Sequence, residues 1–468
     1  MEILTTIAAL CFLMFVAYRG FSVILFAPLA ALFAVAWVSP HHILPFFSGI
    51  YMEKLVGFLK PYFPVFLLGA IFGKLIEISG FAKSITAKVV GILGKNNAML
   101  AVVAVCALLT YGGVSLFVAA FAVYPVASEL FKASDIPRRL IPGTIALGSF
   151  TFTMDALPGS PQIQNIIPTT FFHTNTWAAP KLGLFGALVV LTAGMSYLSY
   201  QRRKAASAGE GYGADPESPA NASAATGLDG SLPSPWLALL PLLLVGILNR
   251  VFTGALPAMY PQSFDFAKLG IAQTAALDTS KLVAIWAVEG ALLVGILTVV
   301  VSAYRSVAPR FAASANIAVA GAMLAAINTA SEYGFGGIIA ALPGFRTISE
   351  FMSHAFTNPL ISLAVTTTGL AGITGSASGG MSIALATLGQ TYLTRATEMG
   401  IPPEVLHRVA SMASGGMDTL PHNGAVITLL AVTGLTHKQS YKDIFAMTLI
   451  KTAAVFLVIG FYYLTHLY

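Results

Sequence analysis

Residues 282–304 read LVAIWAVEGALLVGILTVVVSAY and contain a single charged residue, Glu289. An α-helix needs about 20 mostly apolar residues to cross the hydrocarbon core of a bilayer, and this stretch is long enough to do so. Comparable apolar windows recur at positions 3–18, 21–38, 62–80, 182–200 and 444–464. The sequence therefore predicts a helical protein that crosses a membrane several times.

The overall composition points to the same class of protein. Hydrophobic residues make up 56% of the 468 residues and charged residues only 9%, which is too little polar surface to cover a water-soluble globule. The net charge of +6 comes from basic residues scattered at the ends of apolar segments, so the positive-inside rule explains it and no nucleic-acid partner is predicted. Arg202, Arg203 and Lys204 place the end of one span in the cytoplasm.

The chain divides into two apolar halves of similar size. Residues 201–235 are rich in Ala, Gly, Ser and Pro, which predicts a flexible cytoplasmic linker. We expect residues 1–200 to form a first membrane repeat and residues 236–468 a second one. The expected fold is an all-α polytopic membrane protein with ten to fourteen spans or half-spans, in two inverted repeats with broken helices and re-entrant hairpins.

Short motifs recur at a constant distance in the two halves. Met154-Asp155-Ala156-Leu157-Pro158 is matched by Met417-Asp418-Thr419-Leu420-Pro421, 263 positions later. The same offset relates Gly112 to Gly375 and Ser115 to Ser378. Two copies of a membrane unit, each interrupted by helix-breaking residues, are typical of secondary transporters that bind substrate near the bilayer midplane.

The interrupted segments are the predicted substrate site. A helix that breaks inside a membrane presents free N–H groups and a positive dipole end, which suit an anion, although small residues there also allow close helix packing. The candidate residues of the first half are Gly112, Gly113, Ser115, Pro158, Gly159, Ser160, Gln162 and Asn165. Those of the second half are Thr374, Gly375, Ser376, Ser378, Gly379, Gly380, His422 and Asn423.

Five acidic residues in or near apolar segments are candidates for proton coupling. An ionisable side chain at membrane depth is costly, which makes it a functional hypothesis. The candidates are Asp155, Asp418, Glu77, Glu289 and Glu332. Two alternatives stay open: each aspartate could cap the half-helix that follows it, and Glu77 could pair with Lys74.

The sequence contains no pattern of an enzyme or of a primary pump. Cys11 and Cys106 both lie in apolar runs, and no metal-ligand cluster, catalytic triad or nucleotide-binding loop is present. No cofactor and no metal are predicted, and the chain is expected not to be an enzyme.

The motifs resemble the gluconate:proton symporter (GntP-type) permeases of the ion transporter superfamily. The resemblance is carried by residues 372–380 (GITGSASGG), 157–161 (LPGSP), His422-Asn423 and 433–436 (TGLT). It implies proton-coupled uptake of a sugar acid or a related hydroxycarboxylate across a bacterial inner membrane. Gluconate-type members carry acidic or histidine residues at positions that match neutral ones here, in 111–115, at Gly159 or Ser160, and after Asn423.

These differences favour a smaller and less hydroxylated substrate. We therefore expect proton-coupled symport of a small organic anion, a hydroxy monocarboxylate such as 3-hydroxybutyrate, lactate or gluconate. A sodium-coupled carboxylate or citrate carrier is the alternative, followed by a channel or a membrane-embedded enzyme. The expected partners are the anion, a proton or sodium ion and the lipid bilayer, with a possible homodimer.

Overall fold

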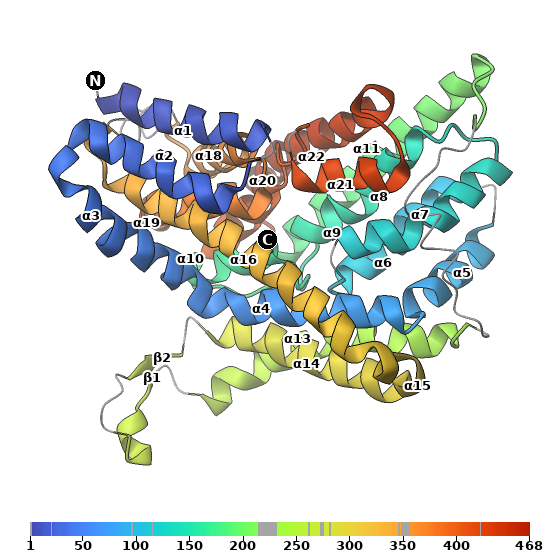
Figure 1. The fold of residues 1–468 in the computed structure, drawn as a ribbon, viewed down its shortest axis with the longest axis horizontal. Coiled ribbons are helices and arrows are strands. Elements are labelled where there is room, and N and C mark those ends of the chain that lie inside the picture. The colour runs from blue at the N-terminus through green and yellow to red at the C-terminus, as the bar shows by residue number, and fades with distance from the viewer. Residues whose placement is uncertain are drawn as a thin grey trace.

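The computed structural model describes residues 2–19, 21–94, 97–114, 116–213, 232–260, 263–271, 276–279, 282–344, 347, 356–421 and 423–468. Almost all regular structure in these residues is helical (Figure 1). The predicted all-α polytopic membrane fold is thus confirmed. One two-stranded antiparallel hairpin, β1 (Ser263–Phe264) with β2 (Leu277–Asp278), lies outside the membrane helices.

The first half begins with helices that precede the interrupted segments and ends with one long helix. Its elements are α1 (Glu2–Tyr18), α2 (Val23–Val38), η1 (Pro40–His42), α3 (Ile43–Phe46), η2 (Phe47–Tyr51), α4 (Met52–Ile78), α5 (Phe81–Leu93), α6 (Ala98–Tyr111), α7 (Leu116–Ala133), α8 (Leu140–Ser149), α9 (Phe152–Asp155), α10 (Ile163–Phe172) and α11 (Pro180–Ser207).

The second half contains the remaining helices. They are α13 (Pro235–Met259), η4 (Phe266–Leu269), α14 (Val283–Ser302), α15 (Tyr304–Val307), η5 (Ala308–Arg310), α16 (Phe311–Ala341), α18 (Pro359–Thr374), α19 (Ala377–Glu398), α20 (Pro403–Ser414), α21 (Gly424–Thr433) and α22 (His437–Thr465).

Among the described residues, six helical stretches are long and apolar enough to cross a bilayer. They are Pro40–Ile78, Pro180–Ser207, Pro235–Met259, Val283–Ser302, Tyr304–Ala341 and His437–Thr465. Shorter apolar helices accompany them, including α6, α18 and α21. Helices of this shorter kind cannot cross about 30 Å of hydrocarbon alone. The fold therefore combines full spans with half-spans.

The end of α11 overlaps the segment that was predicted as a linker. Helix α11 continues to Ser207 and so includes Arg202, Arg203 and Lys204, because Gln, Arg, Lys and Ala are all good helix formers. The chain then returns to the first half, where the Tyr212 hydroxyl lies 2.6 Å from the Ser128 hydroxyl. Residues 201–207 of the predicted linker are therefore helical. Residues 214–231 of the predicted linker lie outside the described residues.

Elements of the two halves recur at the spacing of the sequence motifs. Helix α8 starts at Leu140 and α20 at Pro403, and α6 ends at Tyr111 and α18 at Thr374, so both pairs are 263 positions apart. In Figure 1, α5 to α8 lie on the right, and α18 and α19 lie on the left beside α1 and α2. Helices α9 and α20 contact each other between these groups.

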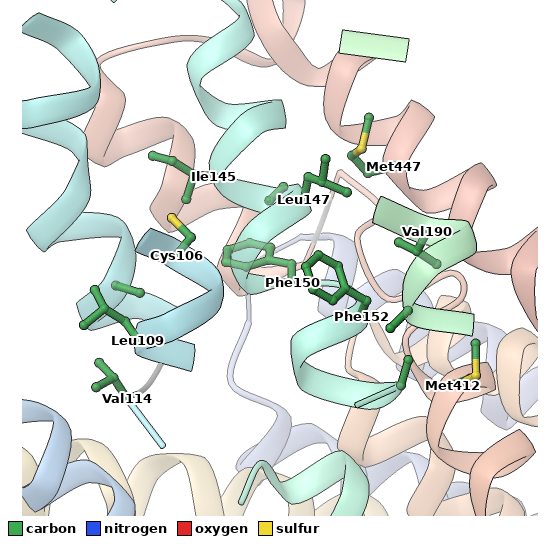
Figure 2. Close-up of a cluster of buried hydrophobic side chains, with 14 of the residues drawn as sticks. Cys106, Leu109, Val114, Ile145, Leu147, Phe150, Phe152, Val190, Met412 and Met447 are labelled. Carbon is green, nitrogen blue, oxygen red and sulfur yellow. The ribbon is translucent and has the colours of Figure 1, made fainter. Parts of the chain in front are cut away.

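A buried apolar cluster surrounds the junction of α8 and α9. Figure 2 shows Phe150 and Phe152 next to each other at this junction. Cys106 from α6, Met412 from α20 and Met447 from α22 belong to the same cluster. Both halves therefore enclose this break in protein, as non-helical backbone at membrane depth requires.

Candidate functional site

The first break in helical structure follows α9 and is held by hydrogen bonds to its carbonyl oxygens. Residues 156–162 are not helical, and Gly159 has the left-handed φ of 77°. The donors are Tyr111 Oη to Pro158 O at 2.9 Å, Asn249 Nδ2 to Gly159 O at 3.0 Å and Asn165 Nδ2 to Ser160 O at 2.9 Å. These three bonds satisfy acceptors that a helix would otherwise pair. We call residues 156–162 the first tip.

The glycine-rich element of the first half lies against the first tip. Gln162 Nε2 donates to Thr110 O at 2.7 Å, at the end of α6. Gly113 follows with φ of 94°, and a Cβ at this position would lie 3.3 Å from the Pro161 ring. The structure thus brings Gly113 and Gln162 together, two residues predicted to bind substrate. Ser115 lies outside the described residues.

The second break follows α20 and mirrors the first in sequence position. Residues 415–421 are not helical, and we call them the second tip. Asn423 begins the next helix: its Oδ1 accepts hydrogen bonds from the backbone N–H groups of Ala425 and Val426. The possibility that Asp418 caps α21 is therefore wrong, since Asn423 does so. His422 lies outside the described residues.

Helix α10, after the first tip, starts without a side-chain cap. Its N-cap residue Gln162 makes no capping hydrogen bond and instead reaches Thr110 O. The capping role considered for Asp155 is therefore wrong as well. An uncapped helix N-terminus retains N–H groups that attract an anion.

The glycine-rich element of the second half is held by hydrogen bonds within that half. Asn423 Nδ2 donates to Gly375 O at 2.6 Å, and Gly375 has φ of 67°. Ser376 then caps α19, because its Oγ accepts from the Gly379 N–H at 3.0 Å. Ser378 Oγ lies 3.1 Å from Thr329 Oγ1 on α16. This part of the predicted site is thus built between α16, α18, α19 and the start of α21.

Helices α18 and α19 touch through their backbones at Gly380. A Cβ on Gly380 would overlap the backbone atoms of Ala371 and Leu370, which no side-chain movement relieves. We predict that Gly380→Ala lowers the free energy of unfolding by about 1–3 kcal/mol or more, the usual cost of overpacking. Gly369→Ala is the control, because a Cβ there meets nothing within 4 Å. Thermal unfolding of the detergent-purified variants measures both, and equal stability would contradict the assigned contact.

Two basic residues that the sequence analysis did not single out hold the breaks together. Arg408 on α20 is completely buried and donates to Ala178 O at 2.8 Å, Asp155 O at 3.1 Å and Asn165 Oδ1 at 3.1 Å. Lys451 on α22 is 2% exposed and donates to Asp418 Oδ1 at 2.5 Å and to Phe150 O at 3.0 Å. Both cations therefore connect the second half to the end of the first broken helix.

The predicted aspartates lie in the same buried cluster. Asp155 is within electrostatic range of Lys451, Asp418 and Arg408. Its Oδ2 has no hydrogen-bond partner among the described residues, and a Cβ on Gly415 would overlap it. Two acids and two bases thus balance each other where the repeated Met-Asp-x-Leu-Pro motifs meet. We call these four residues the charge cluster.

Additional polar side chains of α20 bind the first half beside the charge cluster. His407 is fully buried, with Nδ1 at 2.7 Å from Thr174 Oγ1 and Nε2 at 3.2 Å from Asn165 Oδ1. Ser411 Oγ donates to Asp155 O at 2.7 Å. The sequence signal for this role was the polar run His407-Arg408 within an otherwise apolar segment.

Glu332 forms a separate buried acidic site. It lies on α16 with 3% exposure, and a Cβ on Gly379 would overlap its carboxylate, which therefore presses against α19. Within the described part of the chain no ion pair joins Glu332 to a cation, and Oε2 has no hydrogen-bond partner. Tyr51 Oη, Ser331 Oγ and Ser382 Oγ are likewise buried and unpartnered among these residues.

The remaining two acidic candidates lie on α4 and α14. Glu77, near the end of α4, pairs with Lys74 at 2.8 Å, as the spacing of the two residues allows. Glu289 is half-buried on α14. The five coupling candidates therefore do not form one site: two belong to the charge cluster, and one lies between α16 and α19.

Comparisons with known proteins bear on these observations. No protein-family model matches the chain. The chain is 59% identical over 471 residues to a Bacillus subtilis (strain 168) protein named uncharacterized transporter YxjC, and the alignment covers 100% of both chains.

Two solved transporter structures show a distant likeness. The Alcanivorax borkumensis YdaH transporter is 15% identical, with a TM-score of 0.45 over 88% of each chain. Neisseria gonorrhoeae MtrF, described within a class of antimetabolite efflux pumps, is 12% identical, with a TM-score of 0.44 over 87% of this chain and 82% of that chain. At these TM-scores neither structure defines the fold of this chain.

Proposed function

Because this chain belongs to the same transporter family as the Bacillus subtilis protein YxjC, we propose that it is a secondary active transporter that moves a small organic anion together with a proton. The observation that carries the proposal is the meeting of two broken helices at one buried, charge-balanced cluster. Paired breaks of this kind, in two repeats of a membrane unit, are the arrangement around which alternating access operates.

The anion is proposed to bind at the first tip. Helix α10 starts there without a side-chain cap, whereas Asn423 caps α21 in the second half. The free N–H groups at the start of α10 supply neutral donors, which suit one carboxylate and its hydroxyl group. The resemblance to GntP-type permeases supports a hydroxy monocarboxylate such as 3-hydroxybutyrate, lactate or gluconate, taken up across a bacterial inner membrane.

Glu332 is proposed to carry the proton. The acids of the charge cluster have cationic neighbours that neutralise them, but Glu332 has none among the described residues. Its carboxylate lies between α16 and α19, next to the cap residue Ser376 of the second glycine-rich element. Movement of α19 relative to α16 would open the carboxylate to water, and this couples proton binding to the second break.

A sodium ion in place of the proton is the second candidate. It is favoured by three buried hydroxyl oxygens that make no hydrogen bond among the described residues. Those of Tyr51 and Ser331 lie close to Glu332, and that of Ser382 is on α19. Oxygen ligands of this kind, with one carboxylate, suit a hard cation. Replacing sodium by choline in the assay buffer separates the two coupling ions.

Uptake into proteoliposomes tests the proposed function. Labelled 3-hydroxybutyrate, lactate and gluconate are supplied with and without an imposed pH gradient, acid outside. We expect saturable uptake of at least one of these acids. With one proton per anion, the steady-state accumulation ratio should rise about tenfold for a gradient of about one pH unit, which corresponds to about 1.4 kcal/mol of driving force. Uptake that is indifferent to both the pH gradient and sodium would contradict coupled symport.

A further inference from the structure

A cleft opens between α13 and the end of α6, on the outer side of the first tip. Its volume is about 450 Å³, which is in the range of small-molecule sites. Leu239, Leu243, Ile247 and Arg250 line it from α13, and Leu108 from α6. Leu243 and Ile247 are more than half exposed, at 55% and 58%. Because α13 crosses the membrane, the cleft opens sideways into the bilayer.

Arg250 gives this apolar cleft one positive charge. The side chain is exposed, and in the described part of the chain no ion pair joins it to a carboxylate. Its guanidinium lies over the Trp177 ring, 5.8 Å from the ring centre. A cation among lipid-facing apolar side chains is costly without a counter-charge, so an arginine here indicates an anionic ligand.

The depth of Arg250 decides which anion the cleft takes. The preceding residue, Asn249, donates to Gly159 O in the first tip, so Arg250 lies at the depth of that tip. It is nine residues before the end of α13 at Met259, roughly 14 Å along the helix. A phospholipid would have to bring its phosphate, its glycerol and two chains to this depth, whereas a single-chain lipid brings one carboxylate, whose charge Arg250 neutralises.

We propose that this cleft binds a single-chain fatty carboxylate from the bilayer, with its carboxylate on Arg250 and its tail along α13. The lining positions 239, 243, 247 and 250 share one face of the helix, so the tail extends from Arg250 toward Leu239 over about 16 Å. Gly246, between them, leaves the floor open, because the nearest atom to a Cβ there is Tyr111 Cε1 at 3.9 Å.

The ligand would act on the first tip through two side chains. Tyr111 lines the cleft and donates to Pro158 O, and a Cβ on Gly159 would overlap the Trp177 ring. Occupancy of the cleft therefore stabilises the tip. Gly112 and Tyr111 line the cleft next to the first tip, whereas neither the charge cluster nor Glu332 does. The test measures binding without transport, so its outcome is separate from that of the uptake assay.

Quenching of Trp177 fluorescence tests the proposal directly. A full-length variant with Trp37, Trp236 and Trp286 changed to phenylalanine keeps Trp177 as its tryptophan. In vesicles of neutral phosphatidylcholine, 9,10-dibromostearate is expected to quench Trp177 in a saturable way. Its uncharged methyl ester is expected to give only the linear quenching that follows from partitioning into the bilayer.

Three substitutions in the variant that keeps only Trp177 locate the ligand. Arg250→Gln is expected to weaken the saturable binding at least about tenfold, as the loss of a charge-assisted hydrogen bond implies. Gly246→Leu is expected to abolish it by filling the floor of the cleft. Arg305→Gln, an exposed arginine on α15, is expected to leave it unchanged.

Three results would overturn the proposal. The first is equal quenching by the methyl ester. The second is unchanged affinity in both Arg250→Gln and Gly246→Leu. The third is full displacement of the carboxylate by a lower concentration of phosphatidylglycerol, which would assign the cleft to a phospholipid.

Discussion

Lys451→Met is expected to lower the free energy of unfolding by about 3–5 kcal/mol, the usual cost of removing one partner of a buried ion pair. The substitution leaves Asp418 as a buried charge without its cation and deprives Phe150 O of a hydrogen-bond donor. The side chains of Lys451 and Asp418 are only 2% and 7% exposed, so water cannot replace the missing partner.

The double variant Lys451→Met with Asp418→Leu separates the pair from its surroundings. Replacing a buried ion pair by apolar residues of similar volume is often neutral, so much of the lost stability should return. Lys438→Met is the matched control, because Lys438 is exposed at the start of the same helix. Thermal unfolding in detergent reports all three, and a double variant no more stable than Lys451→Met would contradict the assigned pairing.

The charge cluster explains how two broken helices remain stable in a membrane. Helix α8 ends at Ser149 with carbonyl groups that have no helical partner, and the C-terminal end of a helix is negative. Lys451 donates to one of the carbonyls after this end, and Arg408 binds Asp155 O at the end of α9. The second half thus supplies part of the donors that the first break requires, in addition to Tyr111 and Asn165 of the first half.

The membrane class and the long spans followed from the sequence because apolar length is a local property. The window 282–304 corresponds to α14 (Val283–Ser302), and 182–200 lies inside α11. The constant offset between the Met-Asp-x-Leu-Pro motifs also marked both breaks. The spans are visible in one short stretch of chain, and the repeated motif is visible when two such stretches are compared.

The partners of the aspartates could not be predicted in this way. Lys451 lies inside the window 444–464, and the high average hydropathy of that window hides this single charge. Its partner Asp418 is 33 positions earlier. Arg408 binds carbonyl groups more than 200 positions away, and backbone acceptors leave no trace in the sequence. A cation within an apolar window was nevertheless a usable signal, since such residues at membrane depth are functional by default.

Glu332→Gln is expected to abolish accumulation driven by the pH gradient and to spare exchange of substrate across the membrane. Glutamine keeps the shape and burial of the side chain but cannot bind and release a proton. Exchange needs only that the loaded carrier reorients, whereas uphill uptake also needs the proton to leave. We expect the steady-state accumulation ratio in proteoliposomes to fall about tenfold under a gradient of about one pH unit, to the level without a gradient.

Two further variants show whether this effect belongs to the position of the carboxylate. Glu77→Gln is the control, because Glu77 pairs with Lys74 outside the breaks, and it should accumulate substrate like the parent. Gly379→Ala should reproduce the loss of coupling, since its Cβ would displace the Glu332 carboxylate from α19. Accumulation by Glu332→Gln at the parental rate would remove Glu332 from coupling. Loss of exchange together with accumulation would instead assign it a structural role between α16 and α19.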